Sequence, residues 1–178
     1  MGCLADVLRA EGQLHAAAEQ YEREIALARE IGVRRTEAGA SAQLGILFWS
    51  VGRLEGAREY LARSLEVARG AGLRRDEALA HYNLGVVLGE LGDGAAGEAH
   101  FHAGLPYFEE TRDARLVGLA RGALGQARVA AGDVEGGRRL LEAGRDLARE
   151  SGHAGDEVLA RCRLALLPGG HVEDALAA

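Results

Sequence analysis

The stretch Leu44–Tyr60 reads Leu-Gly-Ile-Leu-Phe-Trp-Ser-Val-Gly-Arg-Leu-Glu-Gly-Ala-Arg-Glu-Tyr, and its pattern recurs along the chain. The spacing is forty residues and holds without an insertion for five leucines: Leu4, Leu44, Leu84, Leu124 and Leu164. A fixed period in this range indicates a solenoid or another array of structural repeats. We therefore predict that the 178 residues form a single repeat domain. Its units are expected at about 1–35, 36–75, 76–115, 116–155 and 156–178, with the first and last units partial.

Each period predicts a pair of helices, here called helix A and helix B. In the best-formed unit, helix A is expected from Thr36, as its N-cap, to about Val51, and Asp76 and Asp156 are the equivalent N-caps. Helix B is expected to begin near Leu54, Gly94 or Val134. Helix A is expected to stop at Gly52, Gly92 and Gly132, because glycine reaches the left-handed conformation without steric cost. Helix B is expected to end in the same way at Gly32, Gly72 and Gly152. This pattern predicts an all-α fold, a right-handed solenoid of antiparallel helix pairs.

Small residues recur where helices A and B are expected to cross. Glycine inside a helix costs about 1 kcal/mol relative to alanine, so its repeated use predicts close packing that a larger side chain would prevent. The crossing positions are Gly45, Gly85 and Gly125 on helix A, and Ala57, Gly97 and Gly137 on helix B. Two irregularities are expected as well: a kink at Pro106, and a less regular turn at Thr111-Arg112-Asp113, which lacks the glycine.

These repeats resemble the tetratricopeptide repeat (TPR), whose unit has Leu-Gly in helix A, a Gly-Asp or Gly-Asn turn, and then an alanine and an aromatic residue in helix B. The first full unit carries Leu44-Gly45, Phe48, Gly52, Leu54, Ala57 and Leu61, and the next carries Leu84-Gly85, Leu88, Gly92-Asp93, Gly97 and Phe101. The usual helix-A tryptophan is replaced by Ser41, His81 and Arg121. The forty-residue unit is longer than the common one and is similar to repeats of kinesin light chains, bacterial peptide-pheromone receptors and large bacterial signalling or transcription-regulator ATPases.

The resemblance implies that helix A lines a concave face that binds peptides or proteins. Gln43 and Asn83 stand where longer-repeat relatives place an asparagine that bonds a peptide backbone, a task suited to an amide, which both donates and accepts. Ala123 and Arg163 depart from that pattern, and Trp49 and Tyr82 could instead pack between repeats. The predicted partner-binding residues are Gln43, Ile46, Trp49, Leu79, Tyr82, Asn83, Val86, Glu90, Gln126 and Val129.

The charge balance disfavours several partners. All 21 basic residues are arginines, and 27 acidic residues bring the formal net charge to −6. Nucleic-acid-binding proteins usually carry a basic patch or stripe, so we predict no nucleic-acid partner. The absence of lysine also disfavours the basic clamp with which some TPR domains grip chaperone tails.

Motifs for catalysis, cofactors and membranes are not found in the sequence. The six histidines are scattered rather than clustered with cysteines as in a zinc site, and no Walker-type loop occurs. No apolar run approaches the roughly 18 residues of a membrane helix, and no secretory signal is evident. Cys3 and Cys162 lie at opposite ends of the predicted array, which favours reduced thiols. We predict a cytoplasmic protein that is not an enzyme, has no cofactor and does not contact membranes.

The prediction for function is a non-catalytic protein- or peptide-binding scaffold that uses the concave helix-A face. Because Met1 falls inside a predicted helix A and Ala178 inside a predicted helix B, the chain is expected to be a piece of a larger bacterial regulatory protein. The alternative is a structural module that stacks into homo-oligomers through its uncapped ends, at Leu4 and Val172.

Overall fold

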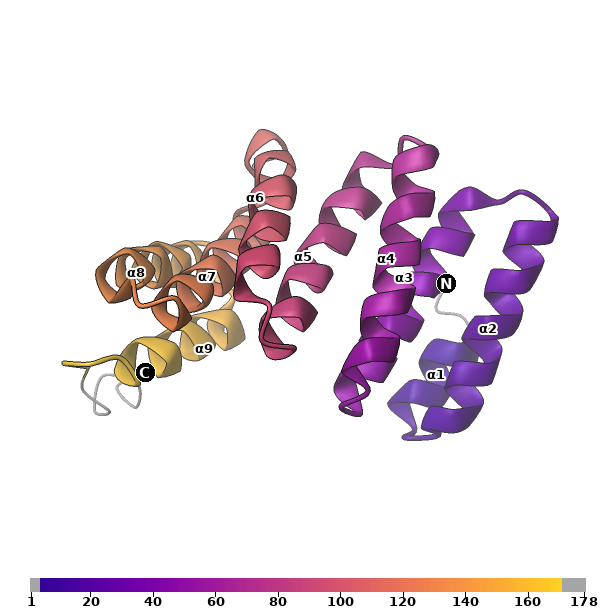
Figure 1. Cartoon of the computed structure of the whole chain (residues 1–178), viewed down its shortest axis with the longest axis horizontal. Helices are drawn as coiled ribbons and strands as arrows, with labels where there is room; N and C mark the ends of the chain where they lie inside the picture. Colours follow the sequence, from indigo (N-terminus) through magenta and orange to yellow (C-terminus); the bar gives the residue numbers. More distant parts are fainter. Residues whose placement is uncertain (1–3, 171–178) are drawn as a thin grey trace. The chain divides into compact units, whose positions relative to one another are not determined.

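The computed structural model describes residues 4–170, which form nine α-helices (Figure 1). The helices are α1 (Leu4–Ala10), α2 (Leu14–Glu30), α3 (Arg34–Ser50), α4 (Leu54–Gly70), α5 (Arg74–Glu90), α6 (Gly94–Glu110), α7 (Ala114–Ala130), α8 (Val134–Glu150) and α9 (Ala154–Ala165). The predicted all-α class is confirmed. Helix B begins at Leu54, Gly94 and Val134, as predicted, and the last helix A is shortened to twelve residues.

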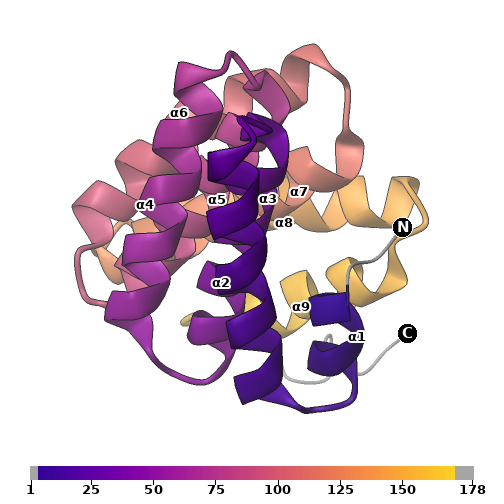
Figure 2. The ribbon, with the colours of Figure 1, turned by 90° about the vertical axis from the view of Figure 1, so that its right-hand side faces the viewer.

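The chain divides into two compact units, Met1–Leu91 with α1 to α5 and Gly92–Ala178 with α6 to α9. Within each unit, helices that follow one another in the sequence pack together. In the first unit α3 also contacts α5, and in the second unit α7 contacts α9. The A helices of successive repeats within a unit are therefore neighbours, as Figures 1 and 2 show for α3 and α5.

Every connection between helices in residues 4–170 is a turn of three residues, built around a left-handed residue. After α2, Gly32 has a φ of +78°. The Val33 N–H donates to the Ala28 carbonyl at 2.8 Å, and the Gly32 N–H donates to the Arg29 carbonyl at 3.3 Å. These two bonds define a Schellman motif, which satisfies carbonyls at the helix end. The predicted glycine stops at Gly32, Gly52, Gly72, Gly92, Gly132 and Gly152 are confirmed, because all have positive φ.

The predicted N-caps of helix A are wrong. Helices α3, α5 and α9 begin at Arg34, Arg74 and Ala154, so Thr36, Asp76 and Asp156 lie inside the first turn rather than at the cap. The reason is that the residue after the left-handed glycine already serves as the N-cap. Side-chain caps are found instead at Asp93, Asp113 and Asp133, whose carboxylates accept the N–H groups of Ala96, Leu116 and Gly136 at 2.9–3.1 Å.

The two expected irregularities of the second unit are accommodated within regular elements. Helix α6 is continuous from Gly94 to Glu110 across Pro106, which lies at an exposed position where water can bond the carbonyl that loses its partner. The turn after α6 has the usual length, and Arg112 adopts the left-handed conformation with a φ of +54°. The repeat length therefore holds where glycine is missing.

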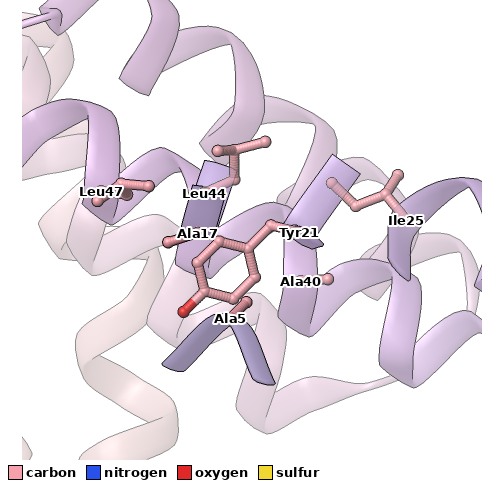
Figure 3. Close-up of a cluster of buried hydrophobic side chains, with 7 residues drawn as sticks. All are labelled: Ala5, Ala17, Tyr21, Ile25, Ala40, Leu44 and Leu47. Carbon is pink, nitrogen blue, oxygen red and sulfur yellow. The ribbon is translucent and has the colours of Figure 1, made fainter. Parts of the chain in front are cut away.

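In the first unit a core of apolar side chains fills the space between α1, α2 and α3 (Figure 3). The Tyr21 ring of α2 is buried, with Ala5 and Ala17 beside it, and its hydroxyl donates to Asp6 of α1 at 2.5 Å. The complete cluster is Ala5, Ala17, Tyr21, Ile25, Ala40, Leu44 and Leu47. A second cluster joins α4 to α5 through Ala57, Leu61, Leu65, Ala80, Leu84 and Val87.

Helices A and B pack closely at three of the predicted small residues, Gly45, Gly125 and Gly137. A Cβ added to Gly45 would lie 2.7 Å from Leu61 Cγ of α4, and one added to Gly125 would lie 2.8 Å from the Gly137 carbonyl oxygen of α8. A second crossing joins α7 to α8, where a Cβ on Gly144 would lie 2.8 Å from the Gly118 carbonyl oxygen. The close packing expected at Gly45, Gly125 and Gly137 is confirmed.

Replacing Gly125 by alanine is expected to lower the free energy of unfolding by about 1–3 kcal/mol, because the added methyl group meets backbone atoms that cannot move independently. The matched control is Gly39→Ala, since a Cβ at Gly39 meets no atom within 4 Å. That change should raise stability by up to about 1 kcal/mol through helix propensity. Denaturant unfolding of both variants tests the crossing, and a stabilised Gly125→Ala would contradict it.

Candidate functional site

Eight of the ten predicted site residues lie on the neighbouring helices α3 and α5 of the first unit. The inner positions of α3, such as Ser41, Leu44 and Leu47, are buried against α2 and α4. Helical spacing leaves a second stripe of side chains along α3 and α5, which the neighbouring helices cover only in part. We call this stripe the α3–α5 face; its members are Gln43, Ile46, Trp49, Leu79, Tyr82, Asn83, Val86 and Glu90.

The α3–α5 face presents two amide groups at equivalent repeat positions. Gln43 and Asn83 are both half-buried. Neither side chain makes a hydrogen bond to another residue of the described range 4–170. A half-buried amide with its donors and acceptor unused is able to bond a ligand without first breaking an internal bond.

Apolar side chains share the α3–α5 face with these amides. Ile46, Leu79, Tyr82 and Val86 are half-buried, and Trp49 keeps 39 % of its surface exposed. Complete burial between repeats would leave Trp49 nearly inaccessible, so this exposure places part of the indole at the surface. Glu90, in the last turn of α5, is exposed and adds one negative charge.

The remaining two predicted residues lie on α7 of the second unit. Gln126 is exposed, whereas Val129 is half-buried. The Cγ2 atom of Val129 lies against Gly137, and Val129 therefore also contributes to the packing of α7 on α8.

Glu37, in the first turn of α3, is a buried carboxylate that joins three helices. It is 1 % exposed and accepts hydrogen bonds from Arg29 of α2 (3.1 Å), Arg34 of α3 (2.8 Å) and Arg63 of α4 (3.3 Å). Burial alone would raise the pKa of this carboxyl group, but the three arginines outweigh it and hold the pKa below its usual value. Sequence reasoning missed this cluster because its partners come from three helices.

A cavity of about 360 Å³ lies along α8 and α9 and was also missed. Four arginines line it: Arg138, Arg145, Arg149 and Arg161. The signal available in the sequence was the repeat register, which places Arg145 where the equivalent position of the first unit has Ile25. An arginine at a repeat position that is apolar and buried in the first unit indicates that this position is not part of an apolar core in the second unit.

Residues 4–170 contain no group of three or more histidine, cysteine or acidic side chains arranged to hold a metal ion. None of the helices in this range is both long and apolar enough to cross a membrane. Cys162 is exposed on α9; Cys3 and Val172 lie outside the described residues.

Comparison with known proteins identifies the fold. Neither a protein-family model nor a curated protein sequence matches the chain. Among solved structures, the apo form of RapI has a TM-score of 0.90 at 16 % identity, over 96 % of this chain and 63 % of RapI. The Rap conjugation gene regulator of plasmid pLS20, solved with the Phr* peptide, has a TM-score of 0.82 at 17 % identity, over 98 % of this chain and 48 % of that regulator.

A third match is a signal transduction ATPase (STAND protein) with a tetratricopeptide repeat sensor from Pyrococcus horikoshii, with a TM-score of 0.74 at 17 % identity. It covers 85 % of this chain and 24 % of the ATPase. The chain is therefore a TPR-like repeat array that spans less than two thirds of RapI, the regulator and the ATPase. At these identities the similarity shows the fold alone.

Replacing Glu37 by glutamine is expected to lower the free energy of unfolding at neutral pH by about 1–3 kcal/mol, because hydrogen bonds from charged donors are weakened. The folded-state pKa is depressed, so the contribution of Glu37 is present above its unfolded pKa of about 4.5. It is lost as the pH falls through the lower folded-state pKa. The difference between wild type and variant should therefore shrink below about pH 4.5.

The matched control is Glu66→Gln, at an exposed acid of α4, which should change stability by less than about 0.5 kcal/mol. Urea unfolding between neutral and acidic pH measures both variants. A Glu37→Gln protein as stable as wild type at neutral pH would contradict the proposed role of this carboxylate.

Proposed function

We propose that this chain is a non-catalytic protein- or peptide-binding array, and that the α3–α5 face receives an extended peptide. The observation that carries the proposal is the pair of half-buried amides, Gln43 and Asn83, whose hydrogen-bonding groups are not used within the described residues. They recur one repeat apart on adjacent helices. A peptide laid across α3 and α5 can bond both.

The chemistry of the face suits a peptide backbone better than a charged ligand. A backbone amide offers one donor and one acceptor, which a side-chain amide matches with its own N–H and carbonyl groups. Ile46, Val86 and the exposed part of Trp49 supply apolar contacts for alternate side chains of the ligand. Gln126 and Val129, on α7, are proposed as partner-binding residues of the second unit.

Two proteins that share the fold suggest the setting in which the array acts. The pLS20 regulator, which shares the fold, was solved with a peptide, and the P. horikoshii ATPase carries its TPR-like part as a sensor. We propose that the array acts in the cytoplasm as the partner-binding segment of a larger bacterial regulatory protein.

A second candidate, self-assembly through the ends, is favoured by one observation. Leu4, Leu27 and Ile31 are 61 %, 58 % and 62 % exposed, and a hollow of about 250 Å³ lies beside Leu4 and Leu27. Such apolar exposure is typical of association surfaces. This alternative predicts a light-scattering mass that rises with concentration in wild type and falls to the monomer value in Leu27→Glu.

The main proposal is tested by panning random linear peptides displayed on phage against the full chain. Selected peptides are then titrated while the fluorescence of Trp49, the single tryptophan, is followed. The double variant Gln43→Ala/Asn83→Ala should weaken Kd at least about fivefold, since each lost hydrogen bond contributes about 0.5–1.5 kcal/mol. Its thermal unfolding should remain that of wild type.

Gln20→Ala is the control, because it removes a half-buried amide from α2, outside the α3–α5 face. It should bind the selected peptides as wild type does. Equal Kd values for wild type and the double variant would show that the amides do not hold the peptide.

A further inference from the structure

The last turns of α3 and α5 form one edge of the α3–α5 face, and their side chains differ from those in its middle. Trp49 is the residue before the last of α3, and Glu90 is the last residue of α5. Both helices are A helices that contact each other within the first unit, and the axes of packed helices lie about 8–10 Å apart. We call the two turns, with Trp49 and Glu90, the C-terminal edge.

Glu90 brings a negative charge to this edge that the chain does not neutralise. The C-terminal end of a helix is itself partly negative, so that a cation is favoured there and an anion is not. Helices α2 and α8 also end in a glutamate, but each carries an arginine in the same turn, Arg29 or Arg149. The last turns of α3 and α5 contain no basic residue, and Glu90 is exposed without a hydrogen bond or ion pair to any residue of the described range.

Trp49 brings an aromatic ring to the same edge. It is 39 % exposed, and its indole contacts no other ring and no guanidinium group among residues 4–170. Arg53, the basic residue nearest to it in the sequence, lies over the Phe48 ring instead, 4.5 Å from the ring centroid. The face of an indole is the best aromatic partner for a cation, and this one is not used by the chain.

The surface beside Glu90 is open. Gly89 occupies the repeat position of Trp49, and a Cβ added to it would meet no atom within 4 Å. Its φ is not in the left-handed region, so neither close packing nor backbone conformation calls for a glycine there. One helix thus supplies the aromatic ring, and the other supplies a carboxylate with free space next to it.

The C-terminal edge lies within reach of a peptide held by the two amides. Gln43 and Asn83 precede Trp49 and Glu90 by six and seven residues, which corresponds to about 9–11 Å along the helices. Helical side chains lean toward the N-terminus of their helix, so the indole and the carboxylate project back toward the amides. A long side chain of the bound peptide can therefore meet both.

We propose that the C-terminal edge binds an arginine side chain of the peptide, with its guanidinium group stacked on Trp49 and bonded to Glu90. Arginine suits this edge better than lysine, because its planar group stacks on aromatic rings and donates two parallel hydrogen bonds to a carboxylate. The inference rests on the function proposed for the α3–α5 face and adds a specificity to it. The amides bind the peptide backbone, and the edge selects a side chain.

The first test pans random linear peptides displayed on phage against wild type, Glu90→Gln and Glu30→Gln in parallel. Peptides selected on wild type should be enriched in arginine at one position relative to the starting library. Glu90→Gln should still select peptides, because Gln43 and Asn83 are intact, but without the arginine. Glu30→Gln is the matched control, since Glu30 is an exposed glutamate at the last position of α2, and it should select as wild type does.

The second test uses one peptide selected on wild type, synthesised with arginine, lysine or citrulline at the enriched position. Citrulline keeps the shape of arginine without its charge. Fluorescence anisotropy should show that citrulline weakens Kd about tenfold on wild type and about threefold on Glu90→Gln, where only the stacking on Trp49 remains. The wild-type loss should shrink as salt is raised, and Trp49→Leu should abolish the preference for arginine over lysine.

The outcomes separate this inference from the function on which it rests. Selected peptides that depend on Gln43 and Asn83 but show no arginine enrichment would overturn the inference and leave the proposed function intact. Equal losses with citrulline on wild type and Glu90→Gln would place the guanidinium group at another acid and also overturn it. A wild-type chain that selects no peptide would overturn both proposals. Thermal unfolding confirms that the variants are folded.

Discussion

The structure depends on one conformational constraint, the left-handed residue in the middle of each three-residue turn. Because the residue after it, such as Val33, both completes the Schellman motif of one helix and caps the next, neither helix can lengthen independently. The full-length helices therefore have seventeen residues each, and every helix pair brings equivalent positions together. Arg112 shows that the constraint lies in the geometry and not in glycine itself, since arginine adopts it there.

This constraint explains which parts of the fold were predictable. The glycine turns, the starts of helix B and the small-residue crossings follow from local chemistry repeated at a fixed spacing. The starts of helix A were misplaced because Thr36 and Asp76 are good caps by type but stand inside the helix by position. The environment of Glu37 was not predictable, because its three arginines are brought together by packing and not by sequence.

The candidate site was predicted in part for the same reason. Repetition in the sequence places Gln43 and Asn83 on equivalent turns of neighbouring helices. The structure adds that both amides are half-buried and make no hydrogen bond to another side chain or backbone group of residues 4–170.

The most direct test of the central proposal, a peptide bound by the α3–α5 face, is the NMR signal of the Asn83 side-chain amide. Asn83 is the chain's single asparagine, so its NH₂ resonances are identified by selective labelling of that residue type. Adding a peptide selected on the full chain should shift these resonances and slow their exchange with water, as a new hydrogen bond requires. Unshifted Asn83 resonances at saturating peptide would contradict the account and place the binding site elsewhere.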